Sequence, residues 1–252
     1  MSNSDWEIRS LVSDHLVDPF QATDLEAILN HLGIHHREQY IGVDSKGNEI
    51  LGAYKALGLR KLIITSPNLL YEARKRFTLA HEIGHAILNH KNSTCIATDF
   101  DLWRDKHVYE REANSFAAEL LLPFIPCSAA IKKSNLTFEL IEDFCKTYRT
   151  SLSATAIRLV RLDGGMTALV AHDGRNVMWK CFSPDCRLDI CSLGIDPNCL
   201  AEKAKQLGRS VRKSVDPEIW CSENTEDLVC EEETRYFPNL KTFISIINIY
   251  EQ

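Results

Sequence analysis

Residues 76–88 read Arg-Phe-Thr-Leu-Ala-His-Glu-Ile-Gly-His-Ala-Ile-Leu, with apolar side chains at the spacing of a packed helix. Residues four apart lie on one face of a helix, so His81 and His85 would present two imidazoles to a single metal ion. Glu82 lies about 100° further round the helix, where its carboxylate would reach a water molecule beside that metal. Two histidines and an adjacent glutamate in this order are typical of zinc hydrolases.

Gly84 stands between the two histidines. A glycine in a helix interior costs about 1 kcal/mol relative to alanine. We therefore expect something to approach the helix closely at this point, either a substrate chain or another backbone. The alternative is that the two histidines serve packing alone, and a third ligand would argue against it.

A catalytic zinc ion takes three protein ligands and keeps a fourth position for water. Residues 108–122 read as a strongly helical segment that ends before Pro123, with small residues that allow close packing on the histidine helix. We expect Glu112 to be the third ligand, with Glu110 as the next choice. His90 is expected to end its helix, off the ligand face. The candidates considered downstream of His85 are His90, Asp99, Asp101, His107, Glu110, Glu112 and Glu119.

Further side chains would support the reaction. Glu119 is expected either to accept a hydrogen bond from a ligand imidazole or to be a surface carboxylate. A donor is also needed for the oxyanion that forms on an attacked peptide carbonyl. Tyr109, His107 and Tyr148 are all candidates, and the residues alone do not separate them.

The combination of residues 76–85 with residues 112–123 (Glu-Ala-Asn-x-Phe-Ala-Ala-Glu-Leu-Leu-x-Pro) resembles the ImmA/IrrE family of zinc metallopeptidases. The resemblance covers roughly the first half of the chain. It implies that His81, His85 and Glu112 bind zinc and that Glu82 is the catalytic base. The ligand set suits Zn²⁺, with Mn²⁺ as the other candidate.

The resemblance also implies an α+β architecture in three parts. A small gluzincin-like metallopeptidase domain would occupy residues 1–128, a helix-turn-helix-like helical unit residues 129–163, and a GAF-like sensory or docking domain residues 164–252. From the residues alone, the last segment reads only as a small α+β domain, with a hairpin at Asp173-Gly174.

Local signals predict several elements. The N-terminal half would contain a helix over residues 5–15, a helix opened by a Thr23–Glu26 capping box and ended at Gly33, and strands over residues 34–41, 50–56 and 61–65. The C-terminal half would contain helices over residues 136–148 and 151–162, and a helix capped by Asp196-Pro197 that runs to Leu207.

Composition limits the expected partners and the cellular location of the protein. The chain has 252 residues and a net charge of −6, which does not favour nonspecific attraction to nucleic acid or to an anionic membrane. The first residues lack the order of a signal peptide, and no apolar run has the length of a membrane span, so we expect a cytoplasmic protein. Nine cysteines without a Cys-x-x-Cys pair are expected to be reduced thiols.

The resemblance implies a protease that cleaves a specific protein, a helix-turn-helix transcriptional repressor, and so derepresses stress-response or mobile-element genes. The alternative is a DNA-binding or partner-binding regulator, in a toxin–antitoxin or phage context, with little or no peptidase activity. Arg158 and Arg161 are the basic residues of the second helix of the helical unit, and the usual turn glycine is absent. A packing or substrate-docking role is therefore favoured over direct DNA binding.

Overall fold

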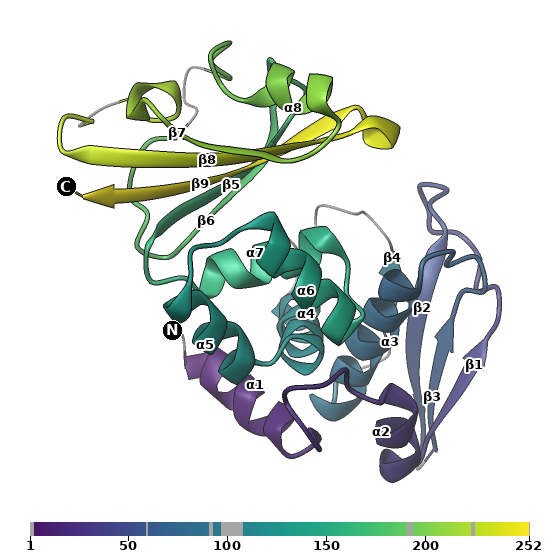
Figure 1. Ribbon diagram of the computed structural model, residues 1–252. Coiled ribbons are helices and arrows are strands. Elements are labelled where there is room, and N and C mark those ends of the chain that lie inside the picture. The colour runs from purple at the N-terminus through teal and green to yellow at the C-terminus, as the bar shows by residue number, and fades with distance from the viewer. Residues whose placement is uncertain are drawn as a thin grey trace. The chain divides into compact units, whose positions relative to one another are not determined.

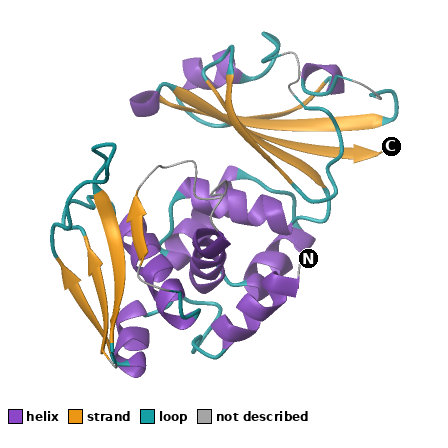
Figure 2. Cartoon of the chain, turned by 180° about the vertical axis from the view of Figure 1, so that it is seen from behind, coloured by secondary structure: helices purple, strands orange, loops and turns teal. Residues whose placement is uncertain are grey.

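The computed structural model describes residues 3–58, 60–90, 93–96, 108–190, 194–222 and 225–251. It is a mixed α+β structure with two separate sheets, which confirms the expected class (Figures 1 and 2). Backbone contacts divide the chain into unit 1 (Met1–Pro126 with Phe144–Ser151) and unit 2 (Cys127–Asp143 with Leu152–Gln252). Among the described helices none alone has the length and apolar content to cross a membrane, and one pair bent by 68° passes that test when its members are joined.

The sheet of unit 1 has the order β1-β3-β2-β4. Its strands are β1 (Ile34–Glu38), β2 (Ile50–Leu57), β3 (Arg60–Thr65) and β4 (Ser93–Ile96). β1 runs parallel to β3, while β2 is antiparallel to both β3 and β4. Among the described strands, β4 therefore lies at an edge of this sheet, and the register between β2 and β4 shifts between Ile50 and Gly52.

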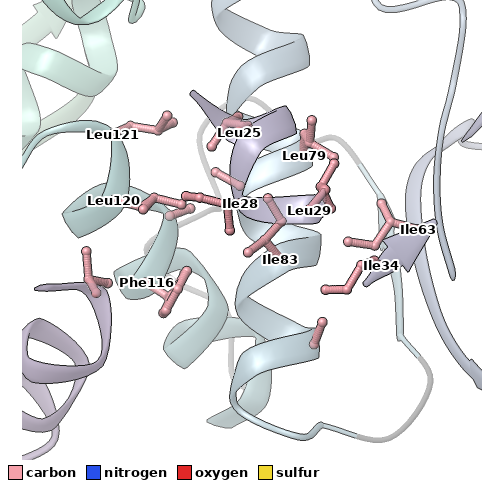
Figure 3. Close-up of a cluster of buried hydrophobic side chains, with 14 of the residues drawn as sticks. Leu25, Ile28, Leu29, Ile34, Ile63, Leu79, Ile83, Phe116, Leu120 and Leu121 are labelled. Carbon is pink, nitrogen blue, oxygen red and sulfur yellow. The ribbon is translucent and has the colours of Figure 1, made fainter. Parts of the chain in front are cut away.

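Helix α3 (Glu72–Ile87) packs on β2 and β3 and is flanked by α4 (Val108–Leu121). The core between them is apolar and combines side chains from six elements besides α4, of which Figure 3 labels residues of α2, β1, β3 and α3. Leu25, Ile28 and Leu29 come from α2 (Leu25–Leu32), Ile34 and Ile63 from the sheet, Leu79 and Ile83 from α3, and Phe116, Leu120 and Leu121 from α4. Burying these side chains fixes one face of α3 against the sheet and another against α4, which positions the histidines.

The capping prediction for α2 is off by one residue. Asp24 is the N-cap, and its Oδ1 accepts from the Ala27 amide at 3.1 Å. The Thr23 hydroxyl instead donates to the Leu120 carbonyl at 2.8 Å, so a tertiary contact with α4 takes it away from its own helix. Gly33 ends α2 in the left-handed conformation, with φ 64°, as expected.

The remaining helices before the second sheet are α1 (Asn3–Ser13), α5 (Phe124–Lys133), α6 (Phe138–Tyr148) and α7 (Leu152–Leu162). α6 and α7 form where two helices were expected, separated by Arg149 in the left-handed conformation at φ 55°. The turn falls at Arg149, as expected, and arginine stands there in place of the usual glycine.

Unit 2 contains an antiparallel sheet of order β6-β5-β9-β8-β7. The strands are β5 (Met166–His172), β6 (Val177–Phe182), β7 (Val211–Val215), β8 (Leu228–Phe237) and β9 (Thr242–Glu251). The Asp173-Gly174 hairpin is confirmed: Asp173 Oδ1 accepts from the amides of Arg175 and Asn176 at 2.8 and 2.7 Å. The GAF-like likeness of this unit stays a prediction.

The helix expected after Asp196-Pro197 begins later than predicted. α8 spans Ala201–Leu207 and ends at Gly208, with φ 63°. Asp196 caps a preceding turn instead, since its Oδ1 accepts from the Asn198 amide at 2.7 Å and its carbonyl from the Cys199 amide at 3.1 Å.

Three buried cysteines of unit 2 are chemically quiet. Cys199, Cys221 and Cys230 are free thiols. Burial raises the pKa of Cys199 and Cys221 to about 11 and that of Cys230 to about 12. These thiols therefore stay protonated at neutral pH, which disfavours a redox role for them.

Candidate metal centre

Helix α3 brings the two histidines together as their spacing predicts. His81 and His85 are 1% and 0% exposed, and their Nε2 atoms lie 3.0 Å apart. Their rings meet edge to face with centroids 4.7 Å apart. Two buried imidazole nitrogens that point at the same small volume are suited to a shared cation.

Glu110, in the first turn of α4, completes the cluster. Its Oε2 lies 3.1 Å from His81 Nε2, and its Oε1 lies 3.4 Å from His85 Nε2. One donor atom from each of the three residues lies within 4.8 Å of the others. In the described part of the chain, this is the one group of three His, Cys, Asp or Glu residues close enough to hold a metal ion.

The structure thus differs from the expectation for Glu112. Its Oε2 lies 3.0 Å from Nε2 of His90, and Glu110, the second choice, stands beside the two ligand imidazoles. Residues two apart on a helix point about 200° apart, so only one of the two glutamates can face α3 at this height. Ala113 and Asn114 follow Glu110 by three and four residues and share its face. That spacing was a usable signal in the sequence.

The close neighbour expected at Gly84 is α4. A Cβ added at Gly84 would lie 3.2 Å from both Cβ and Cδ1 of Phe116 and 3.3 Å from Cα of Ala113. The glycine lets the two helices approach, and this approach brings Glu110 within reach of the histidines. The prediction of a close backbone neighbour is confirmed, and the neighbour is protein.

Glu82 is fully buried on α3 and lies against strand β2. Its Oε1 would be 2.5 Å from a Cβ added at Gly52. The glycine, next to the register shift between β2 and β4, therefore makes the space that the carboxylate occupies.

The outer nitrogens of both imidazoles have defined partners. His81 Nδ1 lies 2.8 Å from Asn114 Oδ1, and His85 Nδ1 lies 2.9 Å from His90 Nδ1. The amide oxygen of Asn114 is an acceptor, so it fixes the His81 proton on Nδ1 and leaves Nε2 free to bind a metal. Asn114 and His90 were not singled out as partners of the histidines from the sequence.

The charges in the cluster favour metal binding. Burial opposes ionisation of Glu110, but the close imidazoles of His81 and His85 outweigh it, and the pKa of Glu110 is held well below its ordinary value. Burial lowers the pKa of His85, against the opposing pull of Glu110. At neutral pH the site therefore offers a carboxylate and neutral imidazole, which are the forms that bind metals.

The other predicted residues are distributed as follows. Glu119 is buried, which is at odds with a surface carboxylate; it accepts from the Phe124 amide at 2.7 Å and pairs with Arg9 Nε at 3.5 Å. Tyr109 is exposed and stacks on the His90 ring with centroids 4.5 Å apart. The Tyr148 hydroxyl donates to the Pro19 carbonyl at 3.1 Å. His107, Asp99 and Asp101 lie outside the described residues.

The residues fit a tetrahedral metal ion. Zn–N and Zn–O bonds of about 2.0–2.2 Å in a tetrahedral site place neighbouring ligand atoms roughly 3.3–3.6 Å apart. The three measured separations, 3.0, 3.1 and 3.4 Å, approach these values. Two imidazoles and one carboxylate also match the ligand types that zinc takes.

Comparisons with known proteins agree with this geometry. Residues 37–160 match the family model Peptidase_M78, the IrrE N-terminal-like domain. An uncharacterized immunity region protein 2 of Bacillus phage phi105 is 43% identical over 77 residues, which is 30% of this chain and 47% of the relative. The alignment therefore spans about half the length of that curated relative.

A solved structure of a Mycobacterium tuberculosis transcriptional regulator shares the fold. It superposes with a TM-score of 0.55 at 12% identity, covering 100% of this chain and 77% of that protein. At this identity the likeness concerns the fold alone.

Fold and site together define an α+β protein in which helices α3 and α4, packed beside the first sheet, carry a His-His-Glu cluster that could hold a metal ion. Residues 37–160 carry the IrrE N-terminal-like domain, which supports the resemblance of this part of the chain to the ImmA/IrrE family.

Proposed function

We propose that this protein is a zinc-dependent endopeptidase that cleaves a specific helix-turn-helix repressor in the cytoplasm and thereby derepresses the genes it controls. The observation that carries the proposal is the convergence of His81 Nε2, His85 Nε2 and a Glu110 carboxylate oxygen within 4.8 Å. The family assignment supports the reaction class. The phage immunity-region relative and the fold shared with a transcriptional regulator support a regulatory context.

His81, His85 and Glu110 would hold the metal. When bound, a zinc ion supplies a Lewis acid that polarises a peptide carbonyl and activates water for attack. Glu82 is the general base: its carboxylate takes a proton from the attacking water and later delivers that proton to the leaving amine. Burial of Glu82 in the protein keeps the proton transfer away from bulk solvent.

A substrate backbone would be held by strand addition. β4 is an edge strand of the unit 1 sheet and pairs with β2, which carries Gly52 beside Glu82. An extended peptide added to this edge would make main-chain hydrogen bonds with β4, one strand away from Gly52. Of the two oxyanion candidates that the structure describes, Tyr109 is linked to the site through its stacking on His90.

The proposal is tested by zinc titration and by co-expression with the helix-turn-helix proteins encoded beside the gene. The metal-free parent should bind one equivalent of zinc. The zinc-loaded parent should then cut one of these helix-turn-helix proteins at a single position. Glu82→Gln should bind the same amount of zinc and leave that protein intact. Cleavage by Glu82→Gln at the parent's rate would refute the role of Glu82 as base. If the helix-turn-helix proteins encoded beside the gene all stay intact in the presence of the zinc-loaded parent, a repressor is not the substrate.

A DNA-binding regulator makes a different prediction. Its affinity for duplex DNA would fall steeply with salt and would survive Glu82→Gln. Salt-dependent binding of the adjacent promoter by the full chain, without cleavage of any neighbour, would favour that function instead.

A further inference from the structure

The C-terminal end of α3 returns the chain toward its own ligand face. α3 ends at Ile87, and Asn89 takes the left-handed conformation with φ 55°. The His90 amide then donates to the His85 carbonyl at 3.0 Å, which is the six-to-one bond of a Schellman turn. Asparagine tolerates this conformation better than most residues. The turn carries the His90 side chain back beside His85, although the two residues are five apart.

Three side chains, starting from His85, then form a continuous hydrogen-bonded chain that leads away from the His-His-Glu cluster. His85 Nδ1 lies 2.9 Å from His90 Nδ1, and His90 Nε2 lies 3.0 Å from Glu112 Oε2. His90 is 6% exposed, so water competes little for these bonds. Tyr109 stacks on the His90 ring and holds its plane.

The Glu112 carboxylate sets the direction of donation along this chain. The Glu112 carboxylate only accepts, so His90 Nε2 carries a hydrogen. In a neutral His90 the other nitrogen, Nδ1, is then an acceptor, and His85 Nδ1 must carry the hydrogen between them. That arrangement leaves the lone pair of His85 Nε2 directed at His81 and Glu110.

We infer that His90 and Glu112 are positioning residues, which hold His85 in the tautomer and ring orientation that bind the metal. This inference rests on the proposed metal site and deepens it: Glu112 acts on the ligand through His90 and does not itself bind the ion. The two ligand histidines are then oriented by different groups, His81 by the amide of Asn114 and His85 by an imidazole backed by a carboxylate.

The test is zinc affinity of the full-length protein, measured by competition with a chromophoric chelator. His90→Phe keeps a ring for stacking on Tyr109 and removes both nitrogens, and it should weaken zinc binding by about 10- to 100-fold. Glu112→Gln keeps an acceptor but loses the charge, and should weaken binding by about fivefold. Because Glu112 acts only through His90, the double variant should bind zinc as His90→Phe does alone.

A matched control lies in the same unit. His36 Nδ1 pairs with Glu26 Oε1 at 3.3 Å, away from the metal cluster. His36→Phe and Glu26→Gln should leave zinc affinity unchanged. If His90 and Glu112 had only a structural role, substitutions in the His90–Glu112 pair and in the His36–Glu26 pair should change zinc affinity by similarly small amounts.

Nitrogen NMR of the zinc-loaded parent gives a second readout. His90 should show a hydrogen on Nε2 and none on Nδ1, and His85 should show a hydrogen on Nδ1. Parent-like zinc affinity in His90→Phe, or a hydrogen on His90 Nδ1, would overturn the inference while the metal site stands. Absence of zinc binding by the parent would overturn the proposed function, and this inference with it.

Discussion

Gly52 of β2 stands so close to Glu82 of α3 that a methyl group on it would lie 2.5 Å from Glu82 Oε1 and 2.8 Å from Thr78 Cγ2. The backbone of Gly52 does not have a positive φ, so alanine is conformationally allowed there. The glycine is therefore needed for space. A strand residue and a helix residue 30 positions apart in the chain together define where the Glu82 carboxylate, the proposed general base, lies.

Gly52→Ala should retain zinc and lose peptidase activity. The new methyl group would displace the Glu82 carboxylate, and a misplacement of about 1 Å can cost 100-fold in rate. The overpacking should also lower the free energy of unfolding by about 1–3 kcal/mol. Zinc titration, cleavage of the cognate repressor and urea unfolding measure the three effects.

Gly164→Ala is the matched control for that variant. A Cβ added at Gly164 has no atom within 4 Å and the backbone does not require a glycine conformation. Activity and stability should stay at the parent's values. A fully active Gly52→Ala enzyme would show that Glu82 acts from a different position.

Gly84→Ala tests the contact between α3 and α4. Helix propensity alone would stabilise the variant by about 1 kcal/mol. The methyl group would, however, meet Phe116 at 3.2 Å and the Ala113 backbone at 3.3 Å, and a backbone cannot rotate away. We expect α4 to shift, Glu110 to separate from the histidines, and zinc affinity to fall. A variant that gains stability and binds zinc like the parent would contradict this contact.

Glu110→Gln and Glu112→Gln separate the two glutamates. Because Glu110 contacts both Nε2 atoms, its variant should lose zinc affinity by more than the 10- to 100-fold expected of a group outside the ligand set. Glu112→Gln should lose far less. Equal losses in chelator competition, or a larger loss for Glu112→Gln, would return the ligand role to Glu112.

The stability of unit 2 should depend on pH through His172. Its side chain is buried, with Nε2 3.0 Å from Ser245 Oγ, and burial lowers its pKa to about 4. In the unfolded chain its pKa is near 6.5, so between these values the unfolded state binds more protons. Stability is therefore fully present above pH 6.5 and is lost as the pH falls toward 4, by about 3 kcal/mol in total.

His172→Gln keeps a hydrogen-bonding side chain that does not titrate. Urea unfolding at pH 7 and at pH 4.5 should show a smaller loss of stability on acidification in this variant than in the parent. Other titrating groups are common to both proteins and cancel in the comparison. An identical pH dependence in the two proteins would show that His172 is not held neutral.

Many local features of the fold and of the candidate site could be predicted from the sequence alone. The spacing of His81 and His85 predicts two imidazoles on one helix face, and Gly84 predicts a close neighbour. The left-handed end of α2 at Gly33 and the Asp173-Gly174 hairpin are also local features, since each is decided by backbone preferences within a few residues. These predictions need no knowledge of what the segment packs against.

Only the tertiary structure decided between Glu110 and Glu112. Both lie on the same predicted helix, and which face of α4 meets α3 depends on the packing of Ala113 and Phe116 against Gly84. His90 was expected off the ligand face, because helix periodicity was extended past Asn89, where the chain leaves the helix. Gly52 comes near Glu82 only through the packing of β2 on α3. A helix fixes the relative directions of its own side chains, but their partners across the fold are set by packing.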